Sequence, residues 1–131
     1  MTAKEYLGKY RKSFDLAAEI EQHLNELKAE AYQLKDHEGR SATLDAAVAK
    51  YVDACNDAVA YLDMLDCQRR DVKKTIAAVQ SEKLRKLLTE IYIYGKSLVR
   101  IAADRNQSYE HICRLHGNAL NAVRMIRTDL E

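Results

Sequence analysis

Apolar side chains recur at alternating intervals of four and three residues along two long stretches, and this repeat constrains the fold more than any other feature. The first stretch runs from Ala3 to His37 and has a single polar break, at Ser13. A 4–3 repeat puts its members on one stripe of an α-helix, so the sequence predicts one long helix here. The members of this predicted stripe are Tyr6, Tyr10, Ser13, Ala17, Ile20, Leu24, Leu27, Ala31 and Leu34.

A second stretch repeats the pattern, with one three-residue shift before Leu65. Its predicted stripe contains Leu44, Val48, Val52, Cys55, Val59, Leu62, Leu65, Val72, Ile76 and Val79. The polar segment between the two stretches holds Gly39, which can end the first helix, and Ser41 and Thr43, either of which can cap the second. Residues 1–80 therefore predict a long, coiled-coil-like antiparallel hairpin, although the same stripes could instead pair between two chains.

Shorter amphipathic segments follow in residues 81–131. The first is expected from Leu84 to Tyr92, before Gly95; the second, Leu98 to Arg105, has Ser97 as its cap. Asn106 tolerates the positive φ of a tight turn, and Ser108 can cap a last helix that runs to about Arg127. Three short helices separated by capped turns are typical of a helix-turn-helix lobe.

Composition supports an all-α fold. The 131 residues are 47% hydrophobic and 31% charged, with four glycines and no proline, so the residues that sheets and long loops need are scarce. The formal net charge is +1, from −2 over residues 1–80 and +3 over residues 81–131. Positive charge is therefore displaced toward the last third of the chain. From the helix patterns, residues 1–80 are expected to serve dimerisation or protein interaction and residues 81–131 DNA binding.

The sequence also indicates which protein classes to set aside. Its three cysteines form no CxxC pair, which suits a reducing compartment. No apolar run suggests a signal peptide or a membrane span, so a soluble, cytoplasmic protein is expected. Because no nucleophile with a base, no phosphate-binding glycine loop and no metal-ligand spacing is present, the sequence predicts neither an enzyme nor a bound metal or cofactor.

Within the predicted helix-turn-helix, small Ala102 lets the second helix approach, and Ile101, Ile112 and Leu115 are expected to lock the two helices together. The face left for solvent would enter a DNA major groove, where arginine can pair with guanine and glutamate can accept from cytosine. That set is Ser108, Tyr109, Glu110, Cys113 and Arg114. Beside it, Lys96, Arg100 and Arg105 are expected to flank the DNA backbone.

Two further side chains have predicted structural roles. Tyr92 is predicted to be a core residue. His116 is predicted to pack and hydrogen-bond where Gly117 lets another helix approach.

Several short motifs resemble a known family. They are residues 4–7 (KEYL), residues 47–53 (AVAKYVD), the pair Ser108–Tyr109, and residues 115–120 (LHGNAL), which resemble the family's hGxAL signature. Residues 83–126 look like the fourth region of bacterial sigma factors. The whole chain resembles short sigma-region-four-like proteins of phages and prophages of Gram-positive bacteria, related to late-gene transcriptional regulators of the ArpU and RinA type.

The resemblance implies a bacterial transcriptional regulator that binds double-stranded DNA at a promoter-type site. By position it assigns promoter reading to Ser108, Tyr109, Glu110 and Arg114. Two departures accompany it: Arg100 stands where the family usually has glutamate, and Asn106–Gln107 replace a glycine–valine turn. The long helices would form a homodimer or meet another protein, RNA polymerase among the candidates. The rival interpretation is a helical interaction module that binds a host or phage protein without touching DNA.

Overall fold

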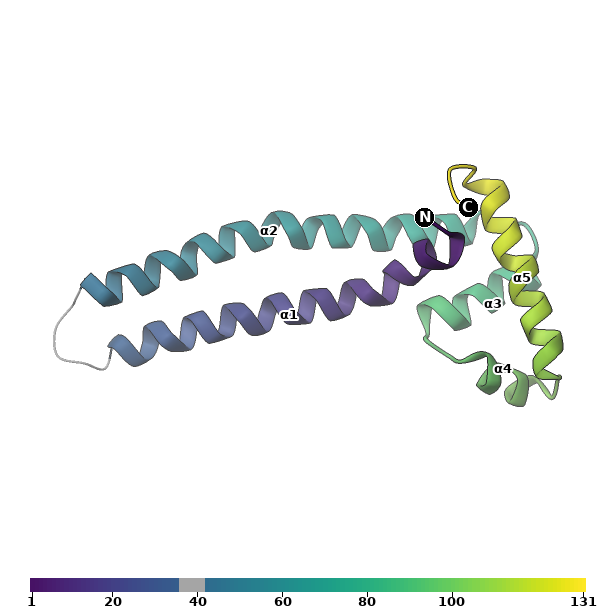
Figure 1. The fold of residues 1–131 in the computed structure, drawn as a ribbon, viewed down its shortest axis with the longest axis horizontal. Helices are drawn as coiled ribbons and strands as arrows, with labels where there is room; N and C mark the ends of the chain where they lie inside the picture. The colour runs from purple at the N-terminus through teal and green to yellow at the C-terminus, as the bar shows by residue number, and fades with distance from the viewer. Residues whose placement is uncertain (36–41) are drawn as a thin grey trace. The chain divides into compact units, whose positions relative to one another are not determined.

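The computed structural model describes residues 1–35 and 42–131, and every regular element within these ranges is helical (Figure 1). The predicted all-α fold is therefore confirmed. The elements in chain order are α1 (Ala3–Lys35), α2 (Ala42–Ala77), α3 (Glu82–Leu88), the π-helix η1 (Thr89–Ile93), α4 (Leu98–Arg105) and α5 (Tyr109–Ile126). The predicted loop residues Gly39 and Ser41 lie outside the described ranges, and Thr43 belongs to the first turn of α2.

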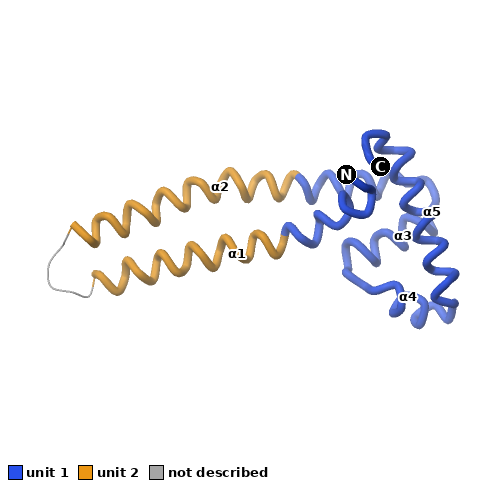
Figure 2. Tube along the Cα trace, viewed as in Figure 1, with its two compact units in different colours: residues 1–13, 68–131 blue, residues 14–67 orange. Residues whose placement is uncertain are grey.

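The chain divides into two compact units (Figure 2). Unit 1 contains residues 1–13 and 68–131, and unit 2 contains residues 14–67. This division differs from the predicted one at residue 80. The physical reason is that the start of α1 and the end of α2 share a buried core with α5 and η1, through residues such as Leu7, Val72, Tyr92 and Val123.

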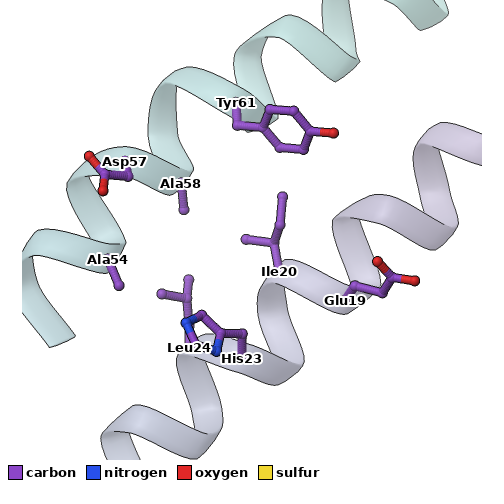
Figure 3. A pocket seen from close by; sticks show the side chains of 8 residues that line it. All are labelled: Glu19, Ile20, His23, Leu24, Ala54, Asp57, Ala58 and Tyr61. Atoms are coloured by element: carbon purple, nitrogen blue, oxygen red, sulfur yellow. The ribbon is translucent and has the colours of Figure 1, made fainter. Parts of the chain in front are cut away.

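Unit 2 contains the remaining residues of α1 and α2, which pack side by side within one chain. Ile20 lies near Tyr61, and Leu24 lies near Ala54 (Figure 3), so the two helices are antiparallel. The predicted stripe of α1 is confirmed, since each of its nine members is buried or half-buried. Ser13 is buried in unit 1, and its hydroxyl donates to the Tyr10 carbonyl at 2.6 Å.

The predicted stripe of α2 is wrong at three positions of its first half, whereas its other seven members are buried or half-buried. Val48, Val52 and Val59 are 40%, 48% and 60% exposed. The less exposed positions of α2 in unit 2 are Leu44, Ala47, Tyr51, Ala54, Cys55, Ala58, Leu62 and Leu65. Positions 44, 47, 51, 54, 58, 62 and 65 step by threes and fours without the predicted three-residue shift. Small alanines at this face let α1 approach closely, and the bulkier valines fall beside the contact.

A polar network holds the two ends of the hairpin in unit 1. The Tyr6 hydroxyl donates to the Asp71 carboxylate and lies 2.9 Å from Thr75 Oγ1. Arg127, which follows α5, donates from Nη1 to the Asp71 carboxylate at 2.8 Å and to the Tyr6 hydroxyl oxygen at 2.9 Å. These contacts connect α1, α2 and the segment after α5. The hydrogen bond from Tyr6 is the main cause that lowers the pKa of Asp71.

The first short helix of the predicted lobe consists of two parts, α3 and one π-helical turn, η1. Gly95 follows with φ of +74°, as predicted for a helix-ending glycine. A Cβ at this position would also come within 2.5 Å of the Arg11 guanidinium, which donates to the Ile93 carbonyl. The positive φ therefore favours glycine, whereas the exposed Arg11 side chain could move aside for a Cβ. Among the described helices, none is both long and apolar enough to span a bilayer.

Candidate nucleic-acid interface

Local sequence determines the path from α4 to α5. The Ser97 hydroxyl oxygen accepts from the Arg100 amide at 3.1 Å and caps α4. Asn106 ends that helix in the left-handed conformation, with φ of 53°. The Ser108 hydroxyl oxygen then accepts from the His111 amide at 3.1 Å and caps α5. Both predicted caps and the predicted turn residue are confirmed. They produce two helices joined by a three-residue turn.

A small apolar cluster holds α4 and α5 together. Ile101 and Ile112 are fully buried, Ala102 is 5% exposed, and Leu87 of α3 completes the cluster. Leu115 packs against it. These are the residues that the sequence predicted would lock the helix pair. Because one side of α5 is held in this cluster, the side chains on the opposite side of its first two turns face outward.

Four of the five predicted recognition residues are exposed: Ser108, Tyr109, Glu110 and Arg114. Cys113 is half-buried. A hydrogen bond with Cys113, one turn along α5, raises the pKa of Tyr109. The exposed Tyr109 hydroxyl can donate to a phosphate oxygen. Within residues 1–35 and 42–131, Arg114 has no ion-pair or hydrogen-bond partner, so its guanidinium is available to a ligand.

The three predicted flanking cations all have acidic neighbours. Lys96 Nζ and Arg100 Nε each lie 3.9 Å from the same Asp104 carboxylate oxygen. Arg105 Nη2 lies 3.2 Å from Glu90 Oε2, and both of these side chains are only about one-quarter exposed. Arg105 therefore has a structural role in connecting α4 to η1. The exposed pairs at Asp104 are weak, since water screens such contacts.

A larger positive charge lies outside the segment that the sequence singled out. Unit 1 as a whole contains 17 basic and 8 acidic side chains, a net charge of +9. Most of the excess comes from the two ends of the hairpin: residues 1–13 and 68–77 carry eight basic and two acidic side chains. Sequence reasoning missed them because it divided the chain at residue 80. Counting the charge of residues 14–67 separately from the rest of the chain would have revealed these basic side chains.

His116 connects α5 to η1. Its Nε2 lies 2.7 Å from the Tyr92 hydroxyl, and burial raises the pKa of Tyr92 to about 12. The predicted hydrogen bond of His116 and the predicted burial of Tyr92 are thus confirmed. The predicted role of Gly117 is wrong, because a Cβ there would have no neighbour within 4 Å. Tyr92 reaches His116 with its long side chain, so no close helix approach is needed.

The half-buried His116 leads to a pH prediction. Burial, and to a lesser degree the positive charge of Lys4, lower the pKa of His116. As the pH falls through the ordinary histidine pKa of about 6.5, the unfolded state therefore binds more protons than the folded state. We expect the free energy of unfolding to reach its full value above that pH and to decrease below it. The decrease should be smaller in His116→Gln, as measured by urea unfolding at several pH values. Equal decreases would contradict this assignment.

Comparison with protein-family models, with curated proteins and with solved structures finds no match to this chain.

Proposed function

We propose that this protein is a phage-type DNA-binding transcriptional regulator that uses a sigma-region-four-like helix-turn-helix. The start of α5 would lie in a major groove and place Glu110 and Arg114 against base edges. The basic side chains of unit 1 would contact the phosphates on either side. RNA polymerase contact and a homodimer through the long helices are further parts of the proposal.

The observation that carries the proposal is the net charge of +9 on the unit that contains the helix-turn-helix. DNA affinity depends mainly on neutralised phosphates, and the +3 of residues 81–131 alone would give weak binding at physiological salt. The lysines and arginines at the ends of the hairpin supply the missing charge. Lys4, Lys12 and Lys74 are exposed, and in the described part of the chain they form no ion pair or hydrogen bond.

Fluorescence anisotropy with DNA fragments from the protein's own genetic neighbourhood tests the proposal. The fragments are titrated over a series of salt concentrations, with and without competitor DNA. A regulator gives saturable binding that survives competitor and a log–log salt slope that reports several phosphate contacts. Binding that competitor removes equally from every fragment would contradict specific recognition.

Arg114→Ala is expected to weaken binding to the selected site by about 1–3 kcal/mol, because a bidentate contact to a guanine is lost. The helical content should not change, since Arg114 is exposed. The matched control is Lys83→Ala, which removes one exposed positive charge from α3 in the same unit. Equal losses in the two variants would show that Arg114 contributes only charge.

The second candidate is a helical interaction module that binds a protein and not DNA. This candidate is favoured by the acidic residues that lie among the flanking cations. Asp104 lies beside Lys96 and Arg100, and Glu90 lies beside Arg105. Alternating charges are more typical of protein interfaces than of DNA-binding surfaces. Failure of every DNA fragment to bind, together with capture of purified RNA polymerase, would favour this alternative.

A further inference from the structure

Unit 2 has the opposite charge to unit 1. Residues 14–67 contain 12 acidic and 4 basic side chains, a net charge of −8. This charge repels polyanions such as DNA. The surface of unit 2 attracts cations and basic proteins over a distance of about one Debye length.

A groove of about 370 Å³ lies between α1 and α2 on this acidic unit (Figure 3). Its apolar residues are Ile20, Leu24, Ala54, Ala58 and Tyr61. Its polar residues are Glu19, His23 and Asp57. Ala54 and Ala58 of α2 lie opposite Ile20 and Leu24, the two larger aliphatic side chains that α1 contributes to the groove.

The acidic residues of the groove are available to a ligand. Glu19 and Asp57 are exposed, come from different helices, and form no ion pair or hydrogen bond with any described residue. In Figure 3 the apolar side chains Ile20 and Leu24 lie between the two helices, with Tyr61 next to Ile20. The groove therefore combines an apolar floor with a carboxylate from each helix.

We propose that this groove docks a basic amphipathic helix of another protein. Aliphatic side chains of that helix would enter over Ala54 and Ala58, and its lysines or arginines would pair with Glu19 and Asp57. Helix-in-groove recognition uses this combination of apolar anchors and complementary charge. The partner is basic because the carboxylates of the groove, and the −8 of the whole unit, both favour positive charge.

The groove is a poor match for the same groove of a second copy. Such a contact would bring two units of charge −8 together and place Glu19 and Asp57 opposite carboxylates of the same kind. Like charges at an interface cost free energy and select against that partner. A helix with basic flanks meets no such repulsion.

Fluorescence anisotropy of the full chain with a synthetic peptide tests the proposal. The probe is a labelled amphipathic helix with leucines on one face and lysines beside them, and a second peptide has glutamate in place of each lysine. We expect binding of the lysine peptide only. The double variant E19K/D57K should weaken that binding by about tenfold or more at 0.15 M salt.

Two matched controls separate the groove from the overall charge. The variant E21K/D63K makes the same change in net charge at exposed acidic residues that do not line the groove, and should weaken binding about threefold at most. Tyr61→Ala should weaken it more than Val59→Ala, since only Tyr61 lines the groove. Equal losses of peptide affinity in E19K/D57K and E21K/D63K, or in Tyr61→Ala and Val59→Ala, would overturn the docking site.

Analytical sedimentation of the chain without peptide tests whether a second copy of the chain occupies the groove. A dimer that E19K/D57K dissociates and E21K/D63K does not would overturn our choice of partner, whereas a monomer, or a dimer that neither variant dissociates, leaves the groove open to a foreign helix. The proposal does not depend on DNA binding, which the proposed function assigns to unit 1. DNA titration of the same variants therefore identifies a failure of the proposed regulator function separately.

Discussion

Replacing Ile112 with alanine is expected to lower the free energy of unfolding by about 2–5 kcal/mol, the usual cost of removing a fully buried isoleucine side chain. Ile112 is fully buried and packs with Ile101, Ala102 and Leu87. It is therefore the α5 side chain at the centre of the cluster that holds α4 and α5 together. Chemical denaturation followed by circular dichroism measures the effect, with the midpoint and the slope fitted separately.

The matched control is Val99→Ala on α4. Val99 is 66% exposed and lies outside the buried cluster, so this variant should change stability by less than about 0.5 kcal/mol. The proposed function adds a second expectation, because the cluster orients the first turn of α5. Ile112→Ala should lose DNA binding before its overall helical content is lost. Similar stability losses for the two variants would show that the cluster does not hold the lobe.

The sequence predicted the α4–α5 pair well because its signals are local. Ser97 and Ser108 cap helices through atoms three residues away, and Asn106 adopts its positive φ within a single turn. Such preferences need no distant partner, so they are readable from the chain. The burial of Ile101 and Ile112 then follows from the faces of the two helices.

The face of α2 was not predictable in the same way. Two neighbouring stripes on this helix carry small or apolar residues, one with Val48, Val52 and Val59 and the other with Ala47, Ala54 and Ala58. Hydrophobicity alone favours the valines. Packing against α1 selects the alanines, because a close approach buries more of both helices than a wider contact over valine side chains.

The candidate site was predicted only in part, for a related reason. The sequence identified the exposed residues of α5, whose positions depend on helix periodicity. It did not associate Lys4, Lys12 or Lys74 with them, because these residues join the same unit only through long-range contacts. The network of Tyr6, Asp71 and Arg127 is one such contact, and it spans 121 residues of the chain.

The largest effect on DNA binding is expected from changing Lys4, Lys12 and Lys74 to glutamine together. If each lysine neutralises one phosphate, the triple variant should lose about a hundredfold in affinity at 0.15 M salt, and its log–log salt slope should fall by about 2.7. The loss should be similar for specific and competitor DNA, since phosphate contacts carry no sequence information. All three side chains are exposed, so we expect no change in stability.

The matched control is the change of Lys28, Lys35 and Lys50 to glutamine, which removes the same charge from unit 2. Its DNA affinity should fall by less than about threefold, because the acidic unit 2 repels phosphates and its lysines are not expected to contact them. Equal losses in the two triple variants would mean that only the net charge of the chain matters. A loss confined to the first variant would support DNA contact by the ends of the hairpin, together with α5. It would also explain how a helix-turn-helix segment of charge +3 binds DNA tightly enough to occupy a site.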